Sequence, residues 1–241
     1  MARQFLNWLA VSPGGRWLDV GCGTGALSEV ILRLMSPAKV TGIDPSADFV
    51  AYARGHVLDP RARFEVGDTR GLPSPSRGFD AVVSGLVLNF VPDPAAAMAE
   101  MARVTRSGGT VGTYVWDYAG GIGLIRRFWD AAVALDPAAA ELDEGRRFAA
   151  FGSHEILVDL FHGAGLRGVD ACVIGVPTPF RDFDDFWTPF LGGQGPAPGY
   201  AMSLSEERRV ALRKRLRSDL PIAADGSISL FARTFGVRGE K

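Results

Sequence analysis

The residues best suited to binding chemistry in this chain lie in the short run from Asp19 to Gly25. Glycines alternate through this run, between an apolar stretch at 17–20 and a helical periodicity at 26–35. A glycine turn between a buried strand and a helix brings bare backbone N–H groups close to a ligand at the helix N-terminus. The spacing from Gly21 also fits a degenerate dinucleotide fingerprint. The carboxylate of Asp19, however, would repel a pyrophosphate and suits a cationic amino group.

Other acidic and polar residues stand where further predicted strands end. Strand-like apolar runs alternate with stretches of helical periodicity, which predicts a parallel, doubly wound α/β sheet. The expected strands cover residues 16–20, 40–43, 63–66, 79–83, 110–116, 169–176 and 227–235; the main expected helices cover 25–35, 46–56, 94–104 and 122–135, with one more capped by Ser153 and running to Gly163. Turn-rich loops are expected at 71–78 and 192–199. Ligands of such sheets bind beyond the carboxyl ends of the strands, where Asp19, Asp44, Asp68, Ser84 and Trp116 are expected.

Five segments, in chain order, resemble the motifs of class I S-adenosylmethionine (AdoMet)-dependent methyltransferases of the small branch called type 11. They are residues 19–25, 41–46, 64–69, 79–90 and 103–110. The resemblance covers about residues 15–118 and fades after Trp116. It implies one three-layer αβα domain over residues 1–241, with a Rossmann-like seven-stranded sheet in the order 3-2-1-4-5-7-6 and its last strand antiparallel. Lid or acceptor-binding insertions are expected at about 118–150 and 180–220.

The resemblance also assigns parts of the cofactor to particular residues. Asp44 would hold the ribose hydroxyls, although it could also cap the helix that follows Pro45. Asp68 would lie near the adenine amino group, although it could also be a turn residue. The full set expected to bind AdoMet is Asp19, Gly21, Cys22, Gly23, Gly25, Asp44, Pro45, Asp68, Thr69, Ser84 and Leu86. No metal ion is expected.

Methyl transfer to a small molecule asks little of catalytic side chains, because the sulfonium methyl is already electrophilic and proximity supplies much of the rate. A general base helps where the acceptor must lose a proton, and the candidates are His154 and Asp117. Aromatic residues at strand ends and in the insertions could roof an apolar acceptor pocket, or could simply pack the insertions onto the sheet. Those expected to bind the acceptor are Trp116, Tyr118, Trp187 and Phe190.

Composition favours a small-molecule enzyme. The net charge of −1 provides no field that would attract nucleic acid or an anionic membrane, and no apolar stretch approaches the ~20 residues of a membrane helix. Two cysteines and a start without an apolar signal run predict a cytoplasmic protein. Three rivals stay open: a nucleic-acid or protein methyltransferase of the same fold, a nicotinamide-dependent oxidoreductase, and an AdoMet-binding protein without catalysis. A homodimer is also left open.

Overall fold

The computed structural model describes residues 1–72, 78–151, 153–192 and 195–241, and these form two compact units. Unit 1 comprises Met1–Val115, Ser153–Ile174 and Phe235–Lys241, and unit 2 comprises Trp116–Gly152 and Gly175–Thr234. Unit 1 therefore contains every residue expected to bind the cofactor, and unit 2 contains both segments expected as insertions. Most of the predicted loop at 71–78 lies outside the described residues.

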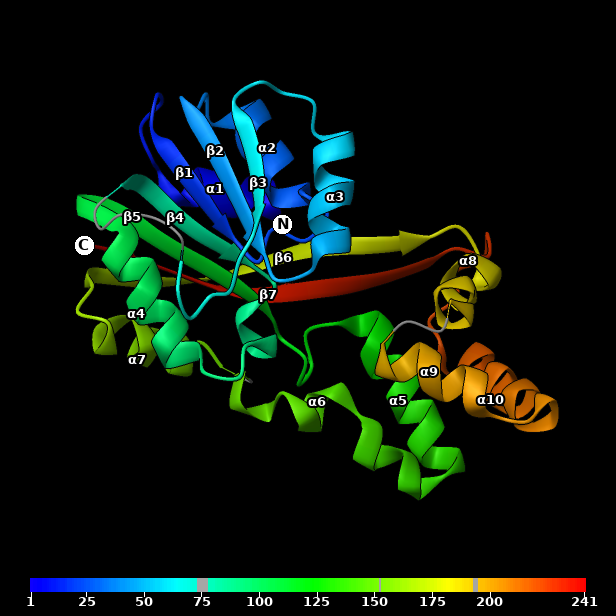
Figure 1. Ribbon diagram of the computed structural model, residues 1–241. Helices are drawn as coiled ribbons and strands as arrows, with labels where there is room; N and C mark the ends of the chain where they lie inside the picture. Colours follow the sequence, from blue (N-terminus) through cyan, green and yellow to red (C-terminus); the bar gives the residue numbers. More distant parts are fainter. Residues whose placement is uncertain (73–77, 152, 193–194) are drawn as a thin grey trace. The chain divides into compact units, whose positions relative to one another are not determined.

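Seven strands form one sheet in the order β3-β2-β1-β4-β5-β7-β6, as predicted (Figure 1). They are β1 (Arg16–Val20), β2 (Lys39–Asp44), β3 (Ala62–Val66), β4 (Phe79–Gly85), β5 (Thr105–Trp116), β6 (Arg167–Phe180) and β7 (Ile228–Glu240). The first five strands pair in parallel. Backbone hydrogen bonds join Gly108 to Lys241 and Asp117 to Arg233. These bonds require β7 to run antiparallel to β5, which confirms the predicted fold class.

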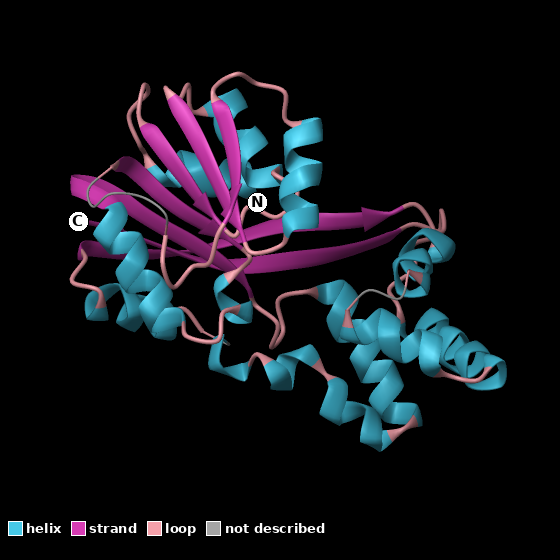
Figure 2. Ribbon diagram, viewed as in Figure 1, coloured by secondary structure: helices cyan, strands magenta, loops and turns pink. Residues whose placement is uncertain are grey.

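The central strands are buried on both faces, as expected when helices cover both sides of a parallel sheet. In β1 every residue after Arg16 is buried, and in β4 all but the second and last residues are buried. Figure 2 shows helices on both faces of this sheet. The apolar runs that predicted these strands are therefore explained by burial, and the polar residues at their ends are the exceptions that need a function.

The helices of unit 1 are α1 (Ala2–Leu9), α2 (Ala26–Leu34), α3 (Ala47–His56), α4 (Pro94–Val104) and α7 (Glu155–Gly163), with a 3₁₀ turn η1 (Leu88–Phe90). Side chains fix two of their starts: Ser46 accepts from the N–H of Phe49, and Asp93 accepts from that of Ala96. The predicted cap of α7 at Ser153 was wrong by one residue, since His154 occupies the N-cap position and its side chain makes no capping bond.

Beside α1 and α2, an apolar core supports the half of the sheet where the cofactor is expected. Phe5 and Leu9 of α1 pack in one cluster with Trp17, Ile31 and Tyr114. This cluster joins β1, β4 and β5 to the two helices that cover the same face. Through these contacts the cluster holds the three strands and the two helices together.

Unit 2 is mainly helical. Its elements are α5 (Gly123–Leu135), η2 (Pro137–Leu142), α6 (Glu144–Arg147), η3 (Ala149–Phe151), α8 (Phe183–Trp187), η4 (Thr188–Leu191), α9 (Pro196–Ser203) and α10 (Glu206–Asp219). Aromatic residues of α5, α8 and η4 form its core. The prediction of a loop over 192–199 was wrong for its second half. Pro196 begins α9 directly after Gly195, which has a positive φ of 87°. Residues 193 and 194 lie outside the described part.

Strand β5 begins at Thr105, earlier than the predicted start at Thr110. A strand beginning at Thr110 would leave the Gly108–Gly109 pair outside it. Instead, Gly108 has a φ of 70° inside β5, and the pairing register with β4 shifts beside it, between Phe79 and Ala81. The glycines therefore serve a bulge within the strand. Among the described residues, no helix has both the length and the apolar character needed to cross a membrane.

Candidate functional site

A cavity of about 590 Å³ opens in unit 1 at the carboxyl ends of the parallel strands. Its volume falls within the roughly 300–1,000 Å³ of pockets that hold small ligands. Of the predicted cofactor residues, those in its wall are Gly21, Cys22, Gly23, Asp44, Pro45, Asp68, Thr69 and Leu86. Asp19, Gly25 and Ser84 lie outside the wall. The structure thus brings three strand ends and the glycine loop together around one space, as the sequence predicted.

The glycine loop is held by the end of β2. The N–H groups of Gly21 and Cys22 both donate to the carbonyl of Ile43, at 2.8 and 3.0 Å. A side chain at position 21 would collide with Val87, 2.5 Å away, so only glycine fits there. Gly23 has a φ of 53° and open space where a side chain would stand. The loop is therefore fixed on one side and bare on the side that lines the cavity.

Asp19, at the end of β1, is a buried carboxylate with one oxygen in use. Only 1% of the residue is exposed. Its Oδ2 accepts from the Ser28 hydroxyl at 2.7 Å, while its Oδ1 has no hydrogen-bond partner among the described residues. Burial raises the pKa of Asp19 to about 6, against the effect of the Ser28 bond, and the nearby charge of Asp44 adds to the rise. A buried, half-satisfied carboxylate needs a cation or a donor from elsewhere.

Asp44, at the end of β2, ties the loops on either side of the cavity together. Its Oδ2 accepts from the N–H of Gly23 and its Oδ1 from the N–H of Ser46, both at 2.9 Å. It does not cap α3 itself, since Ser46 does so. A carboxylate offers about four lone-pair sites. The two remaining sites leave Asp44 able to accept from two further donors in the cavity.

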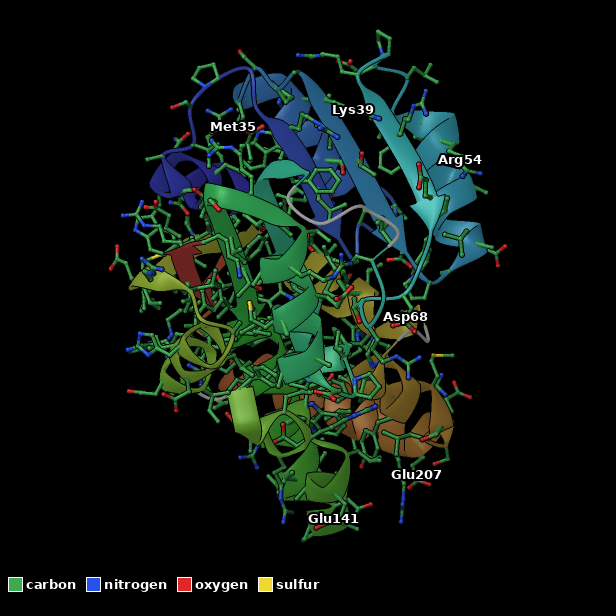
Figure 3. The ribbon with its side chains drawn as sticks, turned by 60° about the vertical axis from the view of Figure 1, so that its left-hand side comes forward. Met35, Lys39, Arg54, Asp68, Glu141 and Glu207 are labelled. Carbon is green, nitrogen blue, oxygen red and sulfur yellow. The ribbon has the colours of Figure 1, made fainter. Side chains whose placement is uncertain are left out.

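Asp68 and Thr69 follow β3 and line the cavity. Figure 3 labels Asp68 beyond the carboxyl end of β3 and Lys39 at the amino end of the parallel strand β2. Asp68 forms a two-pronged ion pair with Arg70, at 2.6 and 3.0 Å. This arginine lowers the pKa of Asp68 to about 2. Asp68 is thus an exposed, ionised acceptor at the rim. Arg70, which lines the cavity, was not predicted from the sequence.

The chain that leaves β4 forms another wall in a strained conformation. Leu86 has a φ of 63°, which is unfavourable for a residue with a branched side chain. Its N–H donates to the carbonyl of Tyr114 at 2.7 Å, which helps to hold this turn. Ser84, just before it, is fully buried, and its hydroxyl oxygen has no partner among the described residues. Backbone strain of this kind often marks functional sites.

Several wall residues were missed by the sequence analysis. They include Phe49 of α3, Val87 and Phe90 beyond β4, and Tyr114 of β5. Val87 and Phe90 fall within the motif segment 79–90, yet no role in binding the cofactor was expected of them, and all four are apolar or aromatic residues of a kind common in cores. Their exposure to the cavity follows only from the assembled sheet.

The two candidate bases have different surroundings. His154 belongs to unit 1, where its half-exposed side chain stands beside Glu155 and its ring lies 6.0 Å from that of Phe235. Asp117 belongs to unit 2 and is 1% exposed. Arg233 donates to its carboxylate through two nitrogens, one of them at 2.7 Å, and Gly120 donates from its backbone. Asp117 therefore has a structural role, and a role for either residue as a base stays a prediction.

The four aromatic residues expected to bind an acceptor all belong to unit 2. Trp187 and Phe190 lie in its core, where Phe190 stacks on Phe128 with ring centroids 4.4 Å apart. Tyr118 packs on Phe148 at 4.6 Å. Trp116 ends β5 and is partly exposed. Packing within unit 2 therefore accounts for three of them, and their contact with an acceptor stays a prediction.

Comparison with known proteins agrees with this geometry. Residues 18–112 match the family model described as a methyltransferase domain. A ubiquinone/menaquinone biosynthesis C-methyltransferase of Desulfotalea psychrophila is 32% identical over 182 residues, which cover 69% of this chain and 72% of that protein. The chain belongs to the class I AdoMet-dependent methyltransferases.

Other methyltransferases match over a shorter stretch. A ubiquinone biosynthesis O-methyltransferase of Xanthomonas campestris is 41% identical over 102 residues, 41% of this chain and 42% of that protein. The chain spans only 42% to 49% of the length of several such curated relatives. The Bacillus subtilis YcgJ protein has the same fold, with a TM-score of 0.63 at 17% identity over 100% of this chain and 97% of that one.

Proposed function

We propose that this methyltransferase binds AdoMet in the cavity of unit 1 and transfers its methyl group to a small-molecule acceptor. The observation that carries the proposal is the pairing of two acids around a bare glycine loop. Asp19 offers one buried oxygen that has no partner among the described residues, and Asp44, which accepts from the N–H of Gly23, offers two further lone-pair sites. A ligand with a cationic amino group at one end and a diol further along would satisfy both acids.

The residues present fit AdoMet. The free oxygen of Asp19 suits the ammonium group, and the open space at Gly23 allows close approach of the backbone. Asp44 would accept from the two ribose hydroxyls, and Asp68 with Thr69 would stand near the adenine. When bound, AdoMet supplies a methyl group on a sulfonium, which needs only a nucleophile held in line. The protein's contribution is then to hold and orient the reactants.

The geometry disfavours a dinucleotide in the same cavity. A pyrophosphate at the glycine loop would lie near two carboxylates, Asp19 and Asp44, and its negative charge would be repelled by both. The net charge of −1 likewise gives no general attraction for a nucleic acid. The two cysteines are unpaired, which supports a reducing compartment such as the cytoplasm.

The choice of acceptor is proposed to reside in unit 2. One relative named above is described as a C-methyltransferase and another as an O-methyltransferase. Because the chain resembles relatives that methylate different atoms, this resemblance does not determine the acceptor atom. Trp116, Tyr118, Trp187 and Phe190 lie outside the family match and remain the proposed acceptor residues.

Calorimetry with AdoMet, S-adenosylhomocysteine and NAD tests the cofactor assignment. Binding of the first two and not of NAD is expected; binding of NAD alone would overturn it. A screen of small quinols, phenols and amines with methyl-labelled AdoMet then tests the reaction. Tight AdoMet binding without transfer to any small molecule, but with transfer to a protein or RNA, would replace the small-molecule proposal by the rival of the same fold.

A further inference from the structure

Tyr114 lies in the cavity wall at a place that the sequence analysis did not mark. It is the last but two residue of β5 and pairs in register with Gly85 of β4. A side-chain carbon built at position 85 would lie 2.8 Å from the Tyr114 hydroxyl oxygen. The tyrosine ring therefore passes over β4, and it can do so only because residue 85 is glycine.

This crossing carries the hydroxyl toward β1. Strand β4 lies between β5 and β1, and Asp19 pairs with Val83, two residues before Gly85 on the same face of the sheet. Burial raises the pKa of the Tyr114 phenol, and the charge of Asp19 adds to the rise. The hydroxyl is therefore neutral at physiological pH. Tyr114 lines the cavity, and the Oδ1 of Asp19, unpartnered among the described residues, belongs to a residue buried behind the wall, on the same face of the sheet.

The position of the ring is fixed from the other side by α1. The ring centroids of Phe5 and Tyr114 are 4.6 Å apart, and only 5% of Tyr114 is exposed. Leu9 of the same helix fills the space over Gly112, two residues earlier on β5. A phenol held in this way loses little conformational entropy when it binds a ligand.

We propose that the Tyr114 hydroxyl and the free oxygen of Asp19 together bind the ammonium group at the amino-acid end of the cofactor. This inference rests on the proposed function. An ammonium group has three N–H donors, so a carboxylate and a phenol oxygen can each accept one. Asp19 supplies the charge. Tyr114 supplies a second hydrogen-bond acceptor at a fixed position, which orients the amino-acid end toward β4 and β5.

Tyr114→Phe tests the proposal, because it removes the hydroxyl and keeps the ring that packs on Phe5. Calorimetry would use three ligands: AdoMet, S-adenosylhomocysteine, and 5′-methylthioadenosine, which lacks the amino-acid part. A lost hydrogen bond to a charged group predicts roughly a 10-fold or greater weakening of the first two. The affinity for methylthioadenosine should stay within about 2-fold. Tyr52→Phe, an exposed tyrosine of α3 outside the wall, is the matched control and should change none of the three.

Other outcomes overturn the proposal. Equal weakening of all three ligands would mean that Tyr114 shapes the pocket without contacting the amino-acid part. Weakening of AdoMet alone would place the hydroxyl at the sulfonium methyl. Unchanged binding of all three would remove Tyr114 from the site. Failure of the wild-type protein to bind AdoMet or its product would instead overturn the proposed function.

A second variant guards against misfolding of the first. In Gly85→Ala the new methyl group would displace the tyrosine ring while leaving the hydroxyl on the chain. The same pattern is expected, with weaker AdoMet and S-adenosylhomocysteine and unchanged methylthioadenosine. Normal AdoMet affinity in a folded Gly85→Ala protein would contradict the proposal, because the ring would no longer need to cross β4 for binding.

Discussion

Replacing Asp19 by asparagine should separate the stability of the free protein from its affinity for AdoMet. Burial raises the pKa of this carboxyl from 3.8 to about 6 in the folded state. The folded protein therefore holds a proton on Asp19 more tightly than the unfolded chain does. Its contribution to stability is fully present below a pH of about 3.8 and is lost as the pH rises to about 6, by roughly 3 kcal/mol.

Asp19→Asn removes the charge and keeps an oxygen that can accept from Ser28. The variant should lose the part of the decline in stability between about pH 4 and 6 that Asp19 causes, because the asparagine at position 19 does not titrate. At pH 7 it should be more stable than the wild type by at most about 3 kcal/mol. The new amide N–H groups offset part of this gain, since burying an unpaired donor costs about 1–3 kcal/mol.

Cofactor affinity should change in the opposite direction. An ionised Asp19 pairs with the ammonium group, and hydrogen bonds to charged groups contribute about 1.5–3 kcal/mol. AdoMet should thus bind Asp19→Asn about 10- to 150-fold more weakly. For the wild type, affinity should fall as the pH drops below about 6, where Asp19 takes up a proton in the free protein.

Thermal unfolding from pH 4 to pH 7.5 and calorimetry with AdoMet measure both effects. Asp48→Asn, a change to an exposed acid of α3, should alter neither. A variant at Asp19 that binds AdoMet as tightly as the wild type would refute the assignment of the ammonium group. A wild-type stability that does not fall between pH 4 and 6 relative to the variant would refute the buried, unpaired carboxylate.

Three further changes test other parts of the structure. Asp44→Asn should weaken AdoMet by about 1.5–3 kcal/mol in calorimetry, with Asp48→Asn unaffected; equal affinities would remove Asp44 from the ribose. Phe190→Ala should lower the free energy of unfolding by about 3–5 kcal/mol in denaturant titrations, because the ring is buried in the core of unit 2; a loss below 1 kcal/mol would contradict that packing. Arg233→Met leaves Asp117 buried without its ion pair, and should lower the free energy of unfolding by about 3 kcal/mol at pH 7 in denaturant titrations; a loss below 1 kcal/mol would speak against the ion pair.

The cofactor half of the molecule could be predicted because its signals are local. Each signal occupies only a few residues of the sequence: a glycine loop between a strand and a helix, or an acid at the end of a strand. The order of the motifs then gave the sheet order, since the family resemblance supplied the topology. Asp44 illustrates the limit of this reasoning. Its bonds to Gly23 and Ser46 show that it also positions the loops, which the sequence alone did not indicate.

Tyr114 could not be predicted, because its place in the cavity depends on three strands at once. Its ring lies over Gly85 of β4, the strand between β5 and β1. In the sequence it is one aromatic residue within an apolar strand, which is typical of a core position. The useful signal was the glycine at the end of β4, since a glycine beside a large residue on the neighbouring strand indicates a close approach.

Unit 2 was the part least accessible to sequence reasoning. Glycines and prolines at 192–199 suggested a loop, yet Pro196 sits at the first position of α9, where its missing N–H costs nothing. The aromatic residues nearby suggested a roof over a pocket, yet Phe186, Trp187 and Phe190 pack mainly with one another and with α5. Aromatic composition alone does not distinguish a pocket from a core.

The division of labour along the chain follows from where the cavity residues lie. Among the described residues, every one in the wall of the cavity falls between Gly21 and Tyr114, and all of these except Tyr114 lie within the family match at 18–112. One continuous segment can therefore carry the residues proposed to bind the cofactor, while the remainder of the chain varies. This division requires that changes in unit 2, such as Phe190→Ala, leave AdoMet affinity intact wherever the protein still folds, so that the acceptor can change in evolution without rebuilding the cofactor site.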